Sequence, residues 1–118
     1  MRPHQKLEAW GKSVDFVVEV YRATGGFPKE ERYSLTLQIR RAATSIPANI
    51  AEGAGRHSPK EFAYFVSNAQ GSASELETEL IIAQRLGYLD ETLFTQLLGK
   101  LERIGRLITG LAKHIRTN

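Results

Sequence analysis

Carboxylates recur at every second position in the third quarter of the chain, at Glu75, Glu77 and Glu79. Helical bundles use such groups to hold a pair of metal ions, but those sites also need a Glu-x-x-His motif on each of two helices. The sequence lacks this motif, and its three histidines lie outside helix interiors or near the end of the chain. At about 100° per residue, Glu75 and Glu79 fall away from the apolar stripe of their helix. We therefore predict a solvated acidic face and no metal site.

Two other patterns that accompany enzymatic chemistry are weak here. Gly53-Ala54-Gly55 resembles part of a phosphate-binding loop, but no strand pattern precedes it and no Gly-Lys-Ser/Thr appears. We expect Gly53 and Gly55 to adopt the left-handed conformations that end a helix. The chain has no cysteine and no nucleophile-elbow motif, and a short helical bundle offers little cleft. The sequence thus predicts a protein that is not an enzyme and that carries no cofactor.

Positive charge is concentrated in the last part of the chain. Residues 92–118 contain five of the 16 Lys and Arg residues but only one of the 13 acids. On a helix, four of these cations project to the side opposite the apolar stripe or next to it: Arg103, Arg106, Lys113 and Arg116. We favour a surface that contacts nucleic-acid phosphates without reading bases, and the alternative is an ordinary solvated helix face. Arg41, Arg56 and Lys60 are further candidates for phosphate contact.

A second surface is notable because it has no charge. On the side of residues 59–86 that faces away from the apolar stripe, six positions are small, polar or apolar: Tyr64, Ser67, Gly71, Ser74, Thr78 and Ile82. A free helix surface usually carries charge. The small residues allow another backbone to approach closely. This face therefore packs either against a neighbour in its own bundle or against another subunit, and we favour the subunit interface.

Four helices are needed to position these surfaces. Apolar residues recur at spacings of three and four in the segments at about 4–23, 29–54, 59–86 and 91–116, and no strand pattern competes with them. Gly25-Gly26 and Gly87 end two of the helices. Ser58-Pro59 with Glu61, and Asp90, begin two others. Because the connections are short, we predict an all-α, antiparallel up-down-up-down four-helix bundle that forms one domain over residues 1–118.

Pro47 breaks the pattern of the second helix. It has no amide to donate to the carbonyl of residue 43, and a proline inside a helix costs about 3 kcal/mol. The apolar positions resume at 48–51, so we expect a kink rather than a stop. Asn49 lies at the border of the apolar face, and we expect its side-chain amide to bond the carbonyls that Pro47 leaves unpaired.

Composition also suggests where the protein works. The absence of cysteine suits a reducing compartment. Residues 1–6 lead directly into an amphipathic helix, with neither the apolar core of a signal peptide nor a run long enough to span a membrane. We therefore expect a soluble, cytoplasmic protein without a membrane partner.

Three motifs point to a known family. QIRRAA at 38–43, SIPANIAEG at 45–53 and GSASELE at 71–77 resemble the 23S rRNA intervening-sequence protein family, also called the four-helix-bundle protein family. The resemblance extends from about Leu7 to Ile115 and includes the segment FPKEE at 27–31.

That resemblance implies an assembly and a class of partner. Relatives form ring-shaped pentamers, and a related branch is similar to the accessory proteins of diversity-generating retroelements, basic barrels that bind nucleic acid and a reverse transcriptase. The resemblance thus implies a non-enzymatic homo-oligomer, most readily a pentamer, that binds RNA or assists a nucleic-acid enzyme. The alternative is a structural or protein-interaction oligomer without affinity for nucleic acid.

Overall fold

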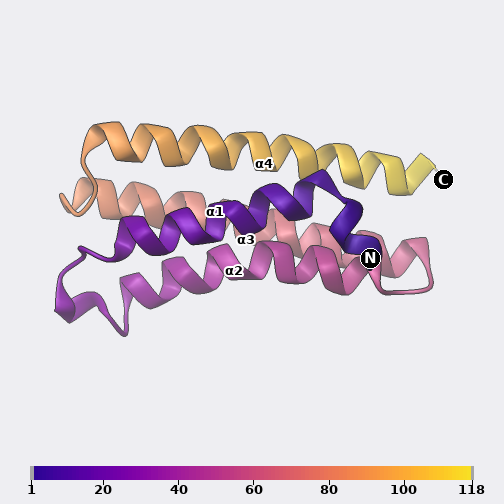
Figure 1. The fold of residues 1–118 in the computed structure, drawn as a ribbon, viewed down its shortest axis with the longest axis horizontal. Helices are drawn as coiled ribbons and strands as arrows, with labels where there is room; N and C mark the ends of the chain where they lie inside the picture. The colour runs from indigo at the N-terminus through magenta and orange to yellow at the C-terminus, as the bar shows by residue number, and fades with distance from the viewer. Residues whose placement is uncertain (1, 118) are drawn as a thin grey trace.

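The computed structural model describes residues 2–117, and within that range the chain is helical and contains no strand. Its four long helices are α1 (Glu8–Thr24), α2 (Leu35–Ala54), α3 (Pro59–Arg85) and α4 (Glu91–Thr117), with the short 3-10 helices η1 (Pro3–Lys6) and η2 (Lys29–Glu31) before α1 and α2. The helices lie along the longest axis of a body of 45 × 24 × 23 Å, and each runs back beside the one before it (Figure 1). No helix in this range is long and apolar enough to cross a membrane.

The core occupies the space between the four helices. Each helix packs on its neighbours in the chain, and α1 also packs on α4, so the four form a closed ring of contacts around one apolar centre. Fully buried side chains come from every helix: Phe16, Val20, Ile39, Ile46, Ile50, Val66, Leu76, Leu80 and Ile108. Burying each of these stabilises the fold by about 1.5 to 3 kcal/mol, so the bundle is held mainly by apolar packing.

The helix ends predicted from local sequence are confirmed for α3 and α4. The Ser58 hydroxyl accepts a hydrogen bond of 3.0 Å from the amide of Glu61, and the Asp90 carboxylate accepts one of 2.7 Å from the amide of Leu93. Gly87 follows α3 with φ of +82°, a left-handed conformation that favours glycine.

The beginnings of the first two predicted helices are wrong by several residues. The segment 3–6 forms a separate 3-10 turn, because Leu7 is extended (φ −85°, ψ 126°) and divides it from α1. Likewise, Lys29–Glu31 is a 3-10 turn, and Ser34 (φ −126°, ψ −101°) separates it from α2. These breaks arise where a short proline-initiated turn closes on itself before the long helix starts.

Glu31 secures the start of α2. One carboxylate oxygen accepts hydrogen bonds from the Ser34 hydroxyl (2.6 Å) and the Leu35 amide (3.4 Å). The other accepts a 2.8 Å bond from the hydroxyl of Tyr88, in the connection between α3 and α4. The bond from Ser34, followed by those from Tyr88 and Leu35, lowers the pKa of the Glu31 carboxyl. This residue therefore ties together the two connections at one end of the bundle.

Helix α2 continues through Pro47, which is buried, so the expectation that the helix does not stop there is confirmed. The kink itself stays a prediction. The role expected for Asn49 is wrong in detail: its amide nitrogen donates to the carbonyl of Ser45 (2.8 Å) and to the Ser45 hydroxyl (2.9 Å), not to the carbonyl of Ala43. Ser45 is one helical turn before Asn49 and within reach, whereas Ala43 is not.

Gly53 has a different role from the one predicted. It lies buried inside α2, and Gly55 ends the helix with φ of −84°, so neither residue is left-handed. A Cβ atom at Gly53 would lie 2.9 Å from both the Phe62 ring and the Cβ of Phe65. The absent side chain therefore lets α2 and α3 approach closely just before their connection.

Candidate nucleic-acid interface

The basic side of α4 faces outward. The stripe of Leu97, Leu101, Ile104, Ile108 and Ile115 is buried against the other helices. The four cations predicted on the opposite side are all exposed: Arg103, Arg106, Lys113 and Arg116. This arrangement follows from α4 packing on α1 and α3 through one arc, which leaves the arc of cations to solvent.

Neighbouring helices divide these cations into two groups. Arg103 leans toward α1, where its guanidinium lies 3.8 Å from the carboxylate of Glu8. Arg106 and Lys113 instead line a shallow hollow between α3 and α4, together with Ser74 and Glu77. The structure therefore brings Arg106 and Lys113 together on the α3 side of α4 and places Arg103 on the α1 side.

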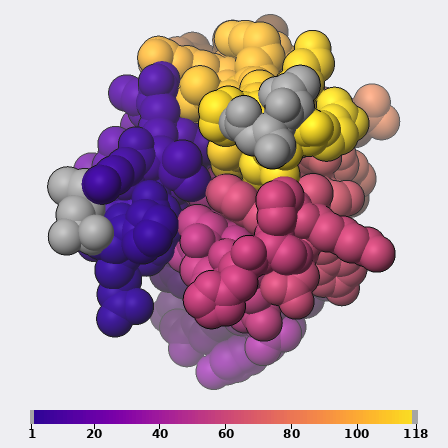
Figure 2. Space-filling model, turned by 90° about the vertical axis from the view of Figure 1, so that its right-hand side faces the viewer, coloured from indigo at the N-terminus to yellow at the C-terminus, as the bar shows by residue number. Residues whose placement is uncertain are grey.

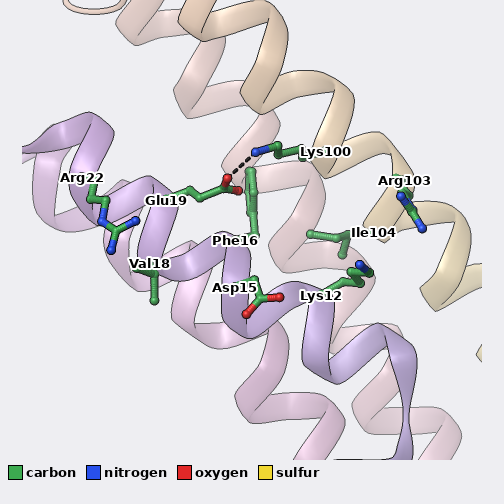
Figure 3. A pocket seen from close by; sticks show the side chains of 9 residues that line it. All are labelled: Lys12, Asp15, Phe16, Val18, Glu19, Arg22, Lys100, Arg103 and Ile104. Atoms are coloured by element: carbon green, nitrogen blue, oxygen red, sulfur yellow. Dashed lines mark hydrogen bonds and ion pairs between the residues drawn. The ribbon is translucent and has the colours of Figure 1, made fainter.

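Arg103 belongs to a groove between α1 and α4, shown in Figure 3. The groove encloses about 440 Å³, and its floor includes the buried side chains of Phe16 and Ile104. Four cations and two acids line it: Lys12, Arg22, Lys100 and Arg103 with Asp15 and Glu19. Lys100 and Glu19 form an ion pair that bridges the two helices, and Arg103 lies near Glu8, so Lys12 and Arg22 are the groove cations that form no ion pair within residues 2–117.

Lys12 and Arg22 were not predicted as site residues. Their spacing places them on the outer side of α1 with Asp15 and Glu19, a pattern that looks like any solvated helix face. Only the packing of α1 beside α4 shows that these cations and Arg103 line one groove.

The remaining predicted cations lie elsewhere. Arg41 is exposed on α2, apart from both grooves, while its neighbour Arg40 bonds across to α1 through the Thr24 hydroxyl (2.9 Å). Arg56 and Lys60 are exposed in and after the connection between α2 and α3. Arg56 pairs with Glu52 and lies 4.9 Å above the centre of the Phe65 ring.

The uncharged face of α3 is on the surface. All six of its residues are exposed, including 63% of Tyr64 and 44% of Ile82. A Cβ atom at Gly71 would meet no heavy atom within 4 Å. The alternative that these six residues pack against a second neighbour in their own bundle is therefore wrong, and the face is open to another molecule.

The acidic residues of α3 do not form the uniform solvated face that we predicted. Glu79 is only 6% exposed, and one of its carboxylate oxygens has no hydrogen-bond partner within residues 2–117. Burial, followed by the charge of Glu75, raises the pKa of Glu79 to about 7. Helix α3 packs on both α2 and α4, so its buried arc is wider than one stripe and includes this position. Within the described range, no group of three or more His, Cys, Asp or Glu residues is placed to hold a metal.

Comparison with known proteins places the chain in a family. The family model described as "23S rRNA-intervening sequence protein" matches residues 5–110. A crystal structure from Bacteroides thetaiotaomicron, of a protein with unknown function from the S23 ribosomal protein family, superimposes with a TM-score of 0.82. The two chains are 24% identical over 89% of this chain and 95% of the other, a likeness that shows the shared fold. No curated protein matches this chain significantly. The chain belongs to the 23S rRNA-intervening sequence protein family.

Proposed function

We propose that this protein is a cytoplasmic, non-enzymatic homo-oligomer that binds RNA or another nucleic acid through phosphate contacts. The observation that carries the proposal is the outward row of cations on α4 in a segment with only one acid. The family description, which names an rRNA intervening sequence, makes RNA the first ligand to test.

The chemistry of the α4 surface favours phosphates over bases. No aromatic side chain is interleaved with Arg103, Arg106 and Lys113, so bases have no stacking platform there. Lysine and arginine bind the sugar–phosphate backbone by releasing condensed counterions, and this binding is insensitive to sequence and sensitive to salt. Affinity per subunit is then modest, and repetition of the surface around an oligomer raises it.

We expect the combined substitution Arg103→Gln, Arg106→Gln and Lys113→Gln to weaken binding of every RNA and DNA sequence by at least about tenfold at low salt. The slope of log affinity against log salt should fall by about 2 for each subunit in contact with a single strand, because three phosphate contacts are lost. Fluorescence anisotropy with labelled RNA over a salt series measures both quantities.

The matched control removes three exposed cations from the end of the bundle at which α1 connects to α2 and α3 connects to α4. These substitutions are Lys29→Gln, Arg32→Gln and Arg85→Gln. It has the same net charge as the α4 variant and should bind nearly as the wild type does. Equal weakening in both variants would show that net charge alone is responsible and would contradict a phosphate surface on α4.

The exposed, uncharged face of α3 supports the oligomer. Tyr64 and Ile82 leave apolar surface in solvent at its two ends, and Gly71 and Ser74 between them allow close approach of a second copy. We propose this face as a subunit interface, and the family resemblance makes a pentamer the expected state.

Gly71→Arg should dissociate the oligomer, because it buries an unpaired charge at the proposed interface. The site is open in the single chain, so the variant should fold normally and differ only in mass. Gly99→Arg, an equally open helical glycine on α4, should keep the wild-type mass. Multi-angle light scattering at micromolar concentration decides the matter, and a wild-type monomer would end the proposal.

The second candidate is a structural or protein-interaction oligomer without affinity for nucleic acid. It is favoured by the same exposed, uncharged α3 face, whose use as a protein interface does not depend on RNA. A wild-type oligomer with no detectable RNA or DNA binding at low salt would support this candidate over the first.

A further inference from the structure

Three segments that are far apart in the sequence meet at one end of the bundle. They are residues 2–6, the connection between α2 and α3, and the last turn of α4, and Figure 2 looks directly at this end. One hollow is lined by residues of the first two segments, among them Arg2, His4, Arg56 and His57. A second joins Arg56 and His57 to His114 of α4. We call this surface the basic end.

All three histidines of the chain are gathered there. His57 and His114 are exposed, and His4 lies edge-on to Trp10 with ring centres 5.0 Å apart. Lys60 is exposed at the start of α3 and Arg116 in the last turn of α4, and Arg2 and Arg56 line the same hollows as the histidines, so fixed positive charge is also concentrated at this end.

The positive charge of the basic end comes from side chains and not from helix macrodipoles. Two helices begin and two end at each end of an antiparallel bundle, so the dipoles largely cancel at both. The opposite end nevertheless carries four acids, which outnumber the cations near them: Glu30, Glu31, Asp90 and Glu91. Acids also lie at this end, namely Glu52, which is paired with Arg56, Glu61 at the start of α3, and Glu8 at the start of α1.

We infer that the basic end is a second phosphate-contact surface and that a nucleic acid bound along α4 continues across it. Lysine, arginine and histidine side chains all donate hydrogen bonds that phosphate oxygens accept. Arg116 lies where the outer side of α4 meets this end, so the two surfaces are continuous. The inference rests on the proposed function and adds the path of the strand.

The test uses the full chain and a labelled single-stranded RNA of mixed sequence, roughly 30 nucleotides long, at constant salt. Affinity is measured by fluorescence anisotropy at a single pH, so that only the substitutions differ between samples.

The comparison removes fixed charge. Arg56→Gln with Lys60→Gln should weaken binding severalfold, and the control Lys29→Gln with Arg32→Gln should not. Because Arg56 packs on Phe65, Lys60→Glu alone provides a variant that leaves this contact intact. If every basic-end variant bound RNA like the wild type and only the α4 variant bound more weakly, this inference would be wrong and the proposed function would stand. If neither the basic-end variants nor the α4 variant bound more weakly, both this inference and the proposed function would be wrong.

Discussion

Replacing Gly53 with valine should lower the free energy of unfolding by about 3 kcal/mol, at the upper end of what overpacking a core costs. The new Cβ alone would lie 2.9 Å from the Phe62 ring and from the Cβ of Phe65, and 3.2 Å from the carbonyl oxygen of Phe62. Backbone and Cβ atoms cannot rotate out of the way. Helices α2 and α3 must therefore separate beside their connection, which loosens the contact of Ile50 and Val66 with the rest of the core.

Urea unfolding followed by circular dichroism measures this effect, at equal protein concentration because assembly changes apparent stability. Gly99→Val is the matched control, since a Cβ atom there would meet no heavy atom within 4 Å. It exchanges one poor helix former for a somewhat better one and should change stability by less than about 0.5 kcal/mol. If the two substitutions had equal effects, the close approach at Gly53 would not limit the packing of α2 on α3.

Glu79→Gln should stabilise the protein by about 2 kcal/mol at alkaline pH and by much less at acidic pH. The pKa of Glu79 is raised from an ordinary 4.5 to about 7 in the folded chain, first by burial and then by Glu75. The folded state therefore holds this proton more tightly than the unfolded state does. The cost of ionising Glu79 in the folded state is absent below pH 4.5, grows as pH rises from 4.5 to about 7, and is complete above about 7. Glutamine has nearly the same shape and no charge to lose.

Thermal unfolding at a series of pH values checks this prediction. The difference in unfolding temperature between variant and wild type should grow from near zero at about pH 4.5 to roughly 10 °C above pH 7. Taking the difference removes the opposite slope from Glu31, whose pKa is lowered. The exposed Glu77→Gln should show no such trend. A flat difference across the whole range would mean that Glu79 is ionised in the folded protein at no cost.

Local signals in the sequence were sufficient for much of the fold. Ser58 and Asp90 were predicted as helix caps because a cap depends on a side chain and an amide three residues apart. The outward position of Arg103 and Arg106 was predicted because helical periodicity fixes which residues oppose the apolar stripe.

The errors share one physical origin, which is contact between segments that the sequence separates. Gly53 was interpreted as a helix terminus because no local feature shows that Phe62 and Phe65 occupy the space beside it. Glu79 was placed in solvent because a single stripe was assumed for a helix that packs on two neighbours. The α1 side of the groove, with Lys12 and Arg22, and the gathering of the histidines at the basic end likewise depend on which helix ends meet.

The contact between α1 and α4 also bears on the order in which the helices pack during folding. Its bridging pair, Lys100 and Glu19, joins positions 81 residues apart, whereas Ser45 and Ser72 join α2 to α3 across only 27. Closing the longer loop costs about 1 kcal/mol more in chain entropy. During synthesis α4 also leaves the ribosome after the other three helices, and until then Ile104 is missing from the groove that Phe16 lines. The contact between α1 and α4 is thus the last to form when the chain folds. A nascent chain that still lacks α4 exposes the apolar surface of α1 there, where it is open to a chaperone or to misassembly.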